Sequence, residues 1–321
     1  MRPLFFCVLV LALLGACSKL SAPLKLYFIG SNRFVSGSRN ANSGDTLAVR
    51  LYADDSLASP SGIKHLQVTI DYSPRTEPFL YPTPLTSFQL AQVRPSTVHL
   101  VYFDSAYAAM PRQLLYTTVF GVRTTTGNEV WNFTVTDQAG NSSNRAFTLR
   151  QRRSDSTAVY NDYTLRLNLL AGTGVRRFID LKSGLAFPGF TALNPTNADI
   201  LQPTLDAVLR ADGSLVSPDY FNNQPALLST TRWKTANRSS TRFALTTLND
   251  VSFLLQTDTL AFHTLFNATT PTNIISGLTT KQVYAFRVKK PASTVSQYGL
   301  LLVANTTSGL QLQVRVAKQP L

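Results

Sequence analysis

Apolar and polar residues alternate with a period of two along much of the chain. In segment 65–72 every second residue is apolar, from Leu66 to Tyr72. Successive side chains of a β-strand point to opposite faces, so this pattern predicts strands with one buried face and one wet face. A single stretch, Thr204–Arg210 after Pro203, is a helical candidate. The alternation recurs in segments 46–52, 131–136, 163–169 and 310–316.

Composition agrees with a β-rich fold. Hydrophobic residues make up 44% and charged residues 15% of the 321 residues, which is too apolar for disorder and too sparsely charged for a coiled coil. Glutamate occurs only at Glu77 and Glu129, whereas threonine is abundant. Low Glu and high Thr favour strands over helices.

The predicted organisation is two β domains joined by a linker. Residues 151–158 are mostly polar and have no apolar face, which is typical of a connecting segment. This places a first domain at residues 24–150 and a second at residues 159–319. The predicted fold class is all-β, with two antiparallel β-sandwich-like domains in tandem.

The first 16 residues have the layout of a secretory signal, with Arg2 before a short apolar run. That run is too short to span a bilayer, which needs about 20 residues. It ends in Leu14-Gly15-Ala16-Cys17, which resembles the lipobox of bacterial lipoproteins. The resemblance implies cleavage between Ala16 and Cys17, thioether lipidation of Cys17 and acylation of its amino group. Residues 17–23 would then be an anchor and tether.

An ordinary secretory signal that happens to contain cysteine is the alternative, and the cysteine count speaks against it. Cys7 lies inside the signal, so the mature chain would keep Cys17 alone, with no disulfide partner. No acidic residue occupies segment 18–23, which favours the outer membrane over inner-membrane retention. Whether the protein faces the periplasm or the cell surface stays open.

Two further resemblances concern the domains. Asp137–Asn141, between two strands, and Gly44-Asp45-Thr46 resemble turns of bacterial immunoglobulin-like domains, and this resemblance covers most of residues 43–150. It implies an immunoglobulin-like first domain. The second domain resembles a carboxy-terminal domain of uncharacterised lipoproteins of Bacteroidota, a family that implies no established activity. The matching pieces are segments 178–184, 198–200, 215–218, 283–286, 298–301 and 310–316.

The net charge of +13 would suit nucleic acid, anionic membrane or acidic glycan. The envelope address excludes nucleic acid from the expected partners. The basic residues are scattered, so solvated faces and linkers explain most of them. The remaining alternative is contact with an anionic membrane or glycan.

The catalytic inventory is poor. The three histidines, His65, His99 and His263, are each expected on a strand surface. No zinc-binding spacing, nucleophile elbow or phosphate loop occurs. We therefore expect no cofactor, no metal and no catalytic residue, and we do not expect an enzyme.

Aromatic residues outside clean strands are the candidate ligand site, because sugars stack on flat rings. Tyr220, Phe221 and Trp233 are the residues chosen, and burial in the core is the alternative for each. A repeated Asp-Ser/Thr pattern resembles the O-glycosylation sequon of envelope proteins of Bacteroidota, although turns and helix caps also favour it. The candidate acceptors are Thr46, Ser56, Ser105, Ser156 and Thr259.

Three functions remain open at this point. The first is a membrane-anchored envelope lipoprotein that binds glycan or protein without catalysis. The second is a structural or accessory subunit of an outer-membrane complex, which a contiguous exposed apolar patch would favour. The third is a glycan hydrolase, which converging carboxylates or histidines in a pocket would favour.

Overall fold

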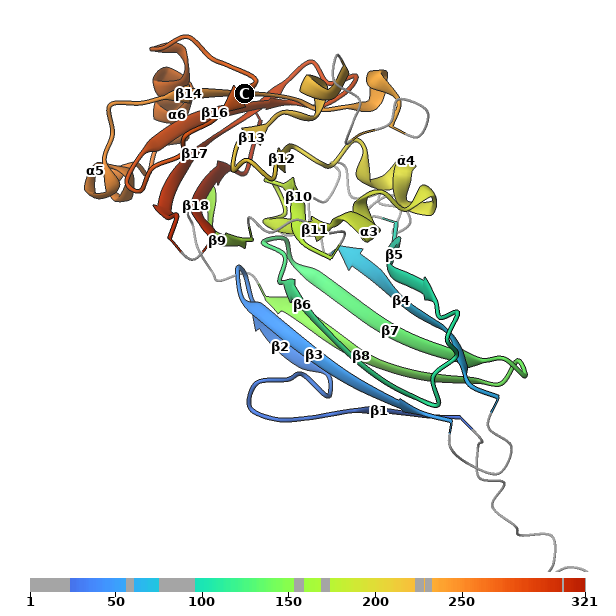
Figure 1. Ribbon diagram of the computed structural model, residues 1–321. Helices are drawn as coiled ribbons and strands as arrows, with labels where there is room; N and C mark the ends of the chain where they lie inside the picture. The colour runs from blue at the N-terminus through green and yellow to red at the C-terminus, as the bar shows by residue number, and fades with distance from the viewer. Residues whose placement is uncertain are drawn as a thin grey trace, which may run out of the picture.

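The computed structural model describes residues 24–55, 61–74, 96–152, 159–168, 174–222, 228, 233–307 and 309–320. Strands dominate these ranges, which confirms the all-β prediction. Figure 1 shows two groups of strands, β1 to β8 below and β9 to β18 above.

The first eight strands form two sheets, one of three strands in the order β1-β3-β6 and one of five in the order β2-β8-β7-β4-β5. Every pairing is antiparallel except that of β2 with β8, which is parallel. The strands are β1 (Lys25–Phe28), β2 (Arg39–Asn42), β3 (Thr46–Asp54), β4 (Ile63–Pro74), β5 (Val98–Ala106), β6 (Gln113–Gly121), β7 (Gly127–Asp137) and β8 (Ser142–Arg152).

The predicted alternation builds the core between these sheets. Leu66, Val68 and Ile70 point inward from β4 and are buried. Aromatic rings fill the space between the sheets, and the rings of Phe120 and Trp131 stack with their centroids 4.0 Å apart. Such stacking adds to the area that both side chains bury.

The hairpin between β7 and β8 has the predicted turn chemistry. The Asp137 carboxylate accepts hydrogen bonds from the Asn141 backbone N–H at 2.8 Å and from its side-chain amide at 2.7 Å. Gly140 has a φ of +88°, which a residue without Cβ adopts at little cost. Thus Asp137, Gly140 and Asn141 each have a local structural reason to be there.

The remaining strands form two five-stranded sheets, β11-β10-β12-β13-β15 and β14-β16-β17-β18-β9, with a second hydrophobic core shared between them. The strands are β9 (Tyr160–Leu167), β10 (Arg176–Asp180), β11 (Leu185–Pro188), β12 (Ala207–Leu209), β13 (Leu215–Val216), β14 (Ser240–Leu245), β15 (Ile274–Ile275), β16 (Val283–Lys289), β17 (Ser296–Asn305) and β18 (Leu310–Ala317).

Short helices complete the second group. Helices α5 and α6 contact β17, and α6 also contacts β14 and β16, where Phe253, Phe262 and Phe266 form a third core against the sheet. The helices are α3 (Gly189–Ala192), α4 (Ala198–Leu201), α5 (Asp250–Leu255) and α6 (Thr259–Asn267), with 3-10 turns η3 (Pro195–Asn197), η4 (Pro218–Asn222) and η5 (Thr235–Asn237).

The two groups of strands pack tightly on one another. The side chain of Asn197 donates to the Val101 carbonyl at 2.7 Å and accepts from the Val101 N–H at 2.9 Å. The Thr124 N–H donates to the Ser183 carbonyl at 2.8 Å. One hydrophobic core contains residues of both groups, so they are held together by burial as well as by hydrogen bonds. The division into two independent domains stays a prediction.

Three local expectations differ from the structure. The helical candidate Thr204–Arg210 contains strand β12, whose buried residues pair with β10 on one side and β13 on the other. A central strand needs apolar residues on both faces, so no alternation marks it. His263 lies on helix α6 and not on a strand. The predicted linker 151–158 begins inside β8, which runs to Arg152.

No helix in the described part of the chain is both long enough and apolar enough to cross a membrane.

Candidate functional site

The three aromatic residues chosen from the sequence do not form an exposed platform. Trp233 is only 2% exposed and Phe221 only 3%. The Trp233 ring packs 6.4 Å from the ring of Phe178, and Tyr220, which is half-buried, meets Phe221 edge to face. The expectation of exposure is therefore wrong for Phe221 and Trp233, which belong to the core.

Arg238 links the backbone around Trp233 by hydrogen bonds. Its buried guanidinium donates to the carbonyls of Trp233 at 2.8 Å and Leu228 at 2.9 Å, and to the side-chain oxygen of Asn222 at 3.0 Å. Burial lowers the pKa of Arg238. The guanidinium satisfies backbone oxygens that water would otherwise bind, so this cation has a structural role.

A second cation of this segment is also engaged. Arg242 forms two hydrogen bonds to the Asp219 carboxylate, at 3.0 and 2.8 Å. Burial raises the pKa of Asp219, but hydrogen bonds led by those from Arg242 outweigh it, and the pKa is lowered overall. Among the described basic residues near Trp233, Arg238 and Arg242 are thus engaged in hydrogen bonds within the protein. Lys234 is exposed.

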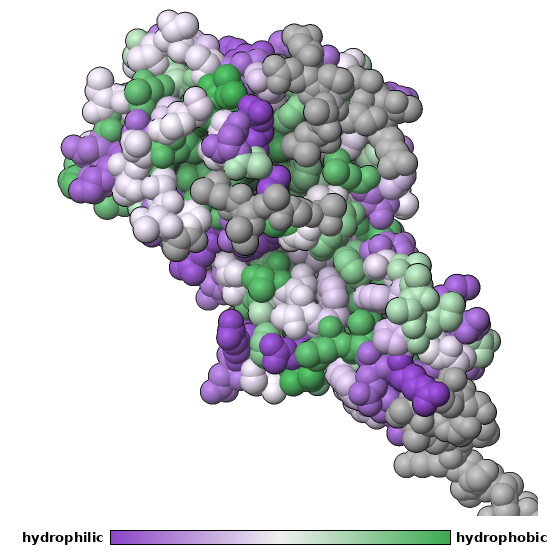
Figure 2. Space-filling model, viewed as in Figure 1, coloured by the Kyte–Doolittle hydropathy of each residue, from purple (hydrophilic) through white to green (hydrophobic). Residues whose placement is uncertain are grey.

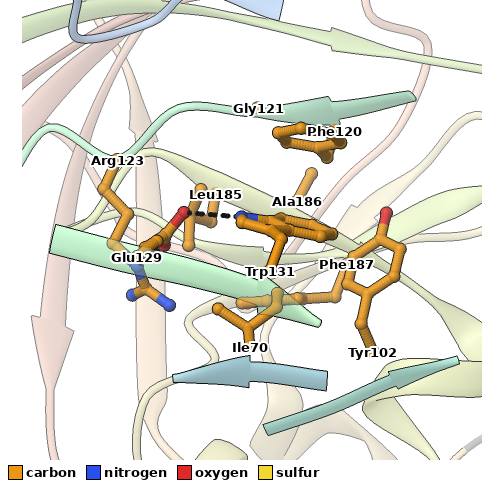
Figure 3. A pocket seen from close by; sticks show the side chains of 10 residues that line it. All are labelled: Ile70, Tyr102, Phe120, Gly121, Arg123, Glu129, Trp131, Leu185, Ala186 and Phe187. Carbon is orange, nitrogen blue, oxygen red and sulfur yellow. Dashed lines mark hydrogen bonds and ion pairs between the residues drawn. The ribbon is translucent and has the colours of Figure 1, made fainter. Parts of the chain in front are cut away.

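The cavity in Figure 3 lies between the two groups of strands and contains an ion pair. Arg123 bonds to Glu129, and the Trp131 ring N–H donates to the second Glu129 oxygen at 3.2 Å. The cavity volume is about 10 Å³, which is room for about one water molecule. This cavity is too small for a sugar ring. Trp131 and Glu129 therefore belong to the contact between the two strand groups and not to a ligand site.

The two histidines of the first strand group pair with surface carboxylates and do not meet each other. His65 bonds to Asp104 at 2.5 Å and His99 to Asp71 at 2.6 Å, and both pairs lie on the open face of the five-stranded sheet. Within those ranges, no three His, Cys, Asp or Glu side chains are placed to hold a metal ion.

Asp206 is the most perturbed carboxyl group. It is buried beside β12, where Lys290 donates to it at 2.5 Å and the Leu181 N–H at 3.1 Å. Burial raises the pKa of Asp206 to about 6, against the opposing effect of the Lys290 ammonium. It is 1% exposed, and its hydrogen bonds to Lys290 and to the Leu181 N–H give it a structural role.

The candidate modification sites divide into two groups. Cys17, with its cleavage partner Ala16, and the acceptors Ser56 and Ser156 lie outside the described residues. Thr46 is exposed, whereas Ser105 and Thr259 are half-buried. Asp258, which precedes Thr259, caps helix α6 by accepting the Leu260 N–H at 3.0 Å, so a local role explains this Asp-Thr pair.

A surface that the sequence did not reveal lies on helix α5 and the start of α6. Val251, Leu254 and Leu255 are spaced three and four residues apart and therefore share one helix face. Together with Leu260 they are 53–73% exposed. We call these four residues the α5 patch. Figure 1 shows α5 at the outer edge of the second group of strands.

The α5 patch is held rigidly from behind. Arg315 on β18 donates to three carbonyls at the end of α5, those of Phe253, Leu254 and Gln256, at 2.8–3.0 Å. The same guanidinium lies 4.9 Å from the centre of the Phe253 ring. A cation on these terminal carbonyls also suits the negative end of the helix. The exposed leucines are thus presented on a fixed support.

The charges near the α5 patch are few, and acids and cations balance there. Asp250 pairs with Lys281 at 3.5 Å at the surface, and Asp258 caps α6. In a chain of net charge +13, an edge without an excess of cations is distinctive. The patch therefore favours an apolar protein partner over an anionic lipid surface, which would select cations.

A second exposed surface is the outer face of the sheet β1-β3-β6. Tyr27, Tyr52 and Leu115 are register partners on its three strands and form one row across the face. In the next row the Arg50 guanidinium lies 4.3 Å from the centre of the Phe34 ring. We call this surface the tyrosine face. Figure 2 shows green apolar surface mixed with white and purple surface over the lower strand group on the side in view.

The local capping sequences were the available signal for the α5 patch. Asn249 and Ser252 form a capping box, which marks the start of a helix. Asp258 marks the next start. A search for period-two alternation alone detects neither helix start.

Comparisons with known proteins identify no relative by sequence: neither a protein-family model nor a curated protein sequence matches the chain. A solved structure of a DUF4466 family protein from Parabacteroides merdae aligns over 92% of this chain and 99% of its own, with 12% identity and a TM-score of 0.33.

Two other solved structures align over 41% of this chain. One is the alkylpurine DNA glycosylase AlkC of Pseudomonas fluorescens bound to DNA containing an abasic site analog, with 31% of that chain covered, 12% identity and a TM-score of 0.23. The other is a beta-glucosidase from Listeria innocua in complex with gluconolactone, with 16% of that chain covered, 10% identity and a TM-score of 0.22. At these TM-scores none of the three carries an argument about fold or function.

Proposed function

We propose that this chain is a lipid-anchored envelope protein of the Bacteroidota type that binds another protein without catalysis. The observation that carries the proposal is the α5 patch, three aliphatic side chains exposed on one face of a supported helix, with Leu260 exposed at the start of the next helix. Contiguous exposed apolar surface of this kind marks interaction sites. This favours a protein-binding or accessory role over glycan hydrolysis.

The energy available at the α5 patch suits a specific contact. Burying the exposed part of one Leu or Val side chain contributes roughly 1–2 kcal/mol. The four side chains together would supply the apolar centre of a small interface, and Asp250 and Asp258 would lie at its polar rim. Because Arg315 already fixes α5, little conformational entropy is lost on binding.

The first described residues lie at the end of the first strand group that is remote from the second group. The start of β1 at Lys25 pairs with Asp54, at the end of the sheet remote from Gly121. Gly121 lies beside Leu185 of the second group of strands. A lipid on Cys17 would therefore hold the first strand group near the outer membrane, and that group would act as a spacer that projects the α5 patch.

The strand order supports an immunoglobulin-like first domain. Strands 1, 3 and 6 form one sheet, and strands 2, 8, 7, 4 and 5 form the other, so the chain crosses between sheets as in Greek-key sandwiches. The lipid anchor has its own test. Cys17→Ser should release the protein from the membrane fraction or leave an uncut precursor, and a mature acylated Cys17→Ser protein in the membrane would contradict it.

The docking proposal is tested with matched charge substitutions. Leu255→Asp places a charge in the α5 patch, and Val295→Asp places the same charge on an exposed valine in the turn between β16 and β17. Both exchanges are at exposed positions, so we expect little change in the thermal midpoint. On native gels of solubilised envelopes, Leu255→Asp should lose a larger complex that wild type and Val295→Asp retain. Loss in both variants, or in neither, would contradict the proposal.

Glycan binding is the second candidate, and the tyrosine face favours it. Two tyrosines in one row offer flat apolar rings, and Arg50 beside them could meet acidic groups. On a glycan array, Tyr52→Ala should weaken any binding several-fold while Leu255→Asp leaves it unchanged. Equal binding by Tyr52→Ala and wild type would exclude the tyrosine face as a glycan site.

A further inference from the structure

One edge of strand β6 has no strand partner in the described part of the chain. The strand pairs with β3 along its whole length, and β3 is its sole partner in the sheet β1-β3-β6. Between Gln113 and Gly121 the strand has no charged residue and no proline. Natural proteins usually protect such edges with charges, proline or bulges, because an unpaired edge recruits another strand.

The register shows which backbone groups point outward. The Asp55 N–H donates to the Arg112 carbonyl and the Val122 N–H to the Asp45 carbonyl, so residues 112 and 122 direct their backbone toward β3. Hydrogen-bonded and non-hydrogen-bonded pairs alternate along an antiparallel ladder. The odd-numbered residues between them therefore direct N–H and C=O away from β3. In agreement, the Val119 carbonyl accepts from the Tyr102 hydroxyl, on the side away from β3, at 3.4 Å.

The same odd-numbered residues have exposed side chains. Leu115 is 59% exposed and Val119 42%, and Thr117 between them is exposed as well. The free edge thus carries apolar and β-branched side chains symmetrically around Thr117. A strand with this order is complementary to an antiparallel copy of itself.

We propose that two copies of this chain pair through the edges of β6, antiparallel and centred on Thr117. In this register Thr117 faces Thr117 of the second copy, and Leu115 faces Val119. Threonine pairs and aliphatic pairs across strands are stabilising, and no like charges meet. The result is one six-stranded sheet in which the two tyrosine faces are continuous. This pairing is independent of the α5 patch and of its proposed partner.

The weak Tyr102–Val119 hydrogen bond agrees with this assignment. At 3.4 Å it is long for an O–H···O bond, whose usual distance is about 2.7–2.8 Å. An N–H from the second copy would give the Val119 carbonyl a better aligned donor. If both copies are lipid-anchored in one membrane, confinement raises their effective concentration, so a short pairing suffices.

Cysteine cross-linking in envelope membranes tests the register. Thr117→Cys in the full chain would place two Cα atoms about 5.5 Å apart across the two-fold axis, within the range for a disulfide. Leu115→Cys alone would place its two cysteines about four residues apart, roughly 13 Å. When Leu115→Cys and Val119→Cys chains are present in the same cells, however, the two introduced cysteines would face each other across the pairing. Thr270→Cys is an exposed control on another part of the chain.

We expect a covalent dimer with Thr117→Cys and with the mixed pair, and none with Leu115→Cys alone, Thr270→Cys or the wild type. Absence of the Thr117→Cys dimer would overturn the proposal. An equal yield with Thr270→Cys or with Leu115→Cys alone would mean random collision and would also overturn it. A Thr117→Cys adduct with a different protein would overturn the choice of a second copy. Leu255→Asp should leave the dimer intact, which separates this result from the docking proposal.

Discussion

The buried carboxyl group of Asp206 makes folding stability depend on pH in a direction that can be measured. Asp206 is 1% exposed, and it bonds to the Lys290 ammonium and the Leu181 N–H. The perturbation is the exchange Asp206→Asn, which keeps the shape of the side chain and removes its titration. The pH dependence of the difference between wild type and variant then isolates this one group.

The magnitude follows from the two pKa values. Burial raises the pKa of Asp206 from 3.8 to about 6 in the folded protein. A shift of about two units corresponds to about 3 kcal/mol. The folded state binds the proton more tightly than the unfolded state, so the sign favours the folded state at low pH. Relative to the variant, wild type should be most stable below about pH 4 and lose about 3 kcal/mol as pH rises through 6.

Urea unfolding of both proteins at several pH values between about 4 and about 7 measures this difference. Other carboxyl groups titrate in both proteins and cancel in the comparison. A difference that does not change with pH would refute the reasoning. A wild type that gains stability over the variant as pH rises would show that Lys290 outweighs burial, and would refute the assigned direction.

Three substitutions test the structural roles assigned above, each by urea unfolding. Trp233→Ala should cost about 3–5 kcal/mol because the ring is buried, and a near-neutral result would restore Trp233 as a surface residue. Arg315→Met should cost about 3 kcal/mol and speed amide exchange in α5, whose terminal carbonyls would lose their donor; unchanged exchange would contradict the support role. Gly299→Ala should cost about 1–3 kcal/mol because its Cβ would meet the Phe286 ring and a backbone carbonyl, and full stability would show that this site relaxes.

Alternation predicted the half-buried strands because their two faces meet different environments. Segments 65–72 and 310–316, for example, lie in β4 and β18. It failed for β12, which is buried on both faces, and Thr204–Arg210 was therefore misassigned as helical. Its failure at α5 has another cause. Phe253 is the one fully buried side chain of that helix, so the segment has no apolar stripe facing the core.

The candidate site was harder to predict because burial outside regular elements depends on tertiary packing. Phe221 lies in the short 3-10 turn η4 and Trp233 lies outside the helices and strands, so in neither place does a period tell a core ring from a surface ring. The Trp233 ring packs against Phe178, which comes from a distant part of the chain. The exposed edge of β6 likewise follows from sheet order, which the strand's own residues do not specify.

The central claim is that the α5 patch docks a protein, and site-specific photocrosslinking in living cells tests it most directly. A photoreactive side chain at position 255 lies in the patch, and one at position 295 lies at an exposed valine away from it. We expect a discrete protein adduct at 255, none at 295, and loss of the adduct when Leu254→Asp is added. No adduct at 255, or the same adducts at both positions, would contradict it.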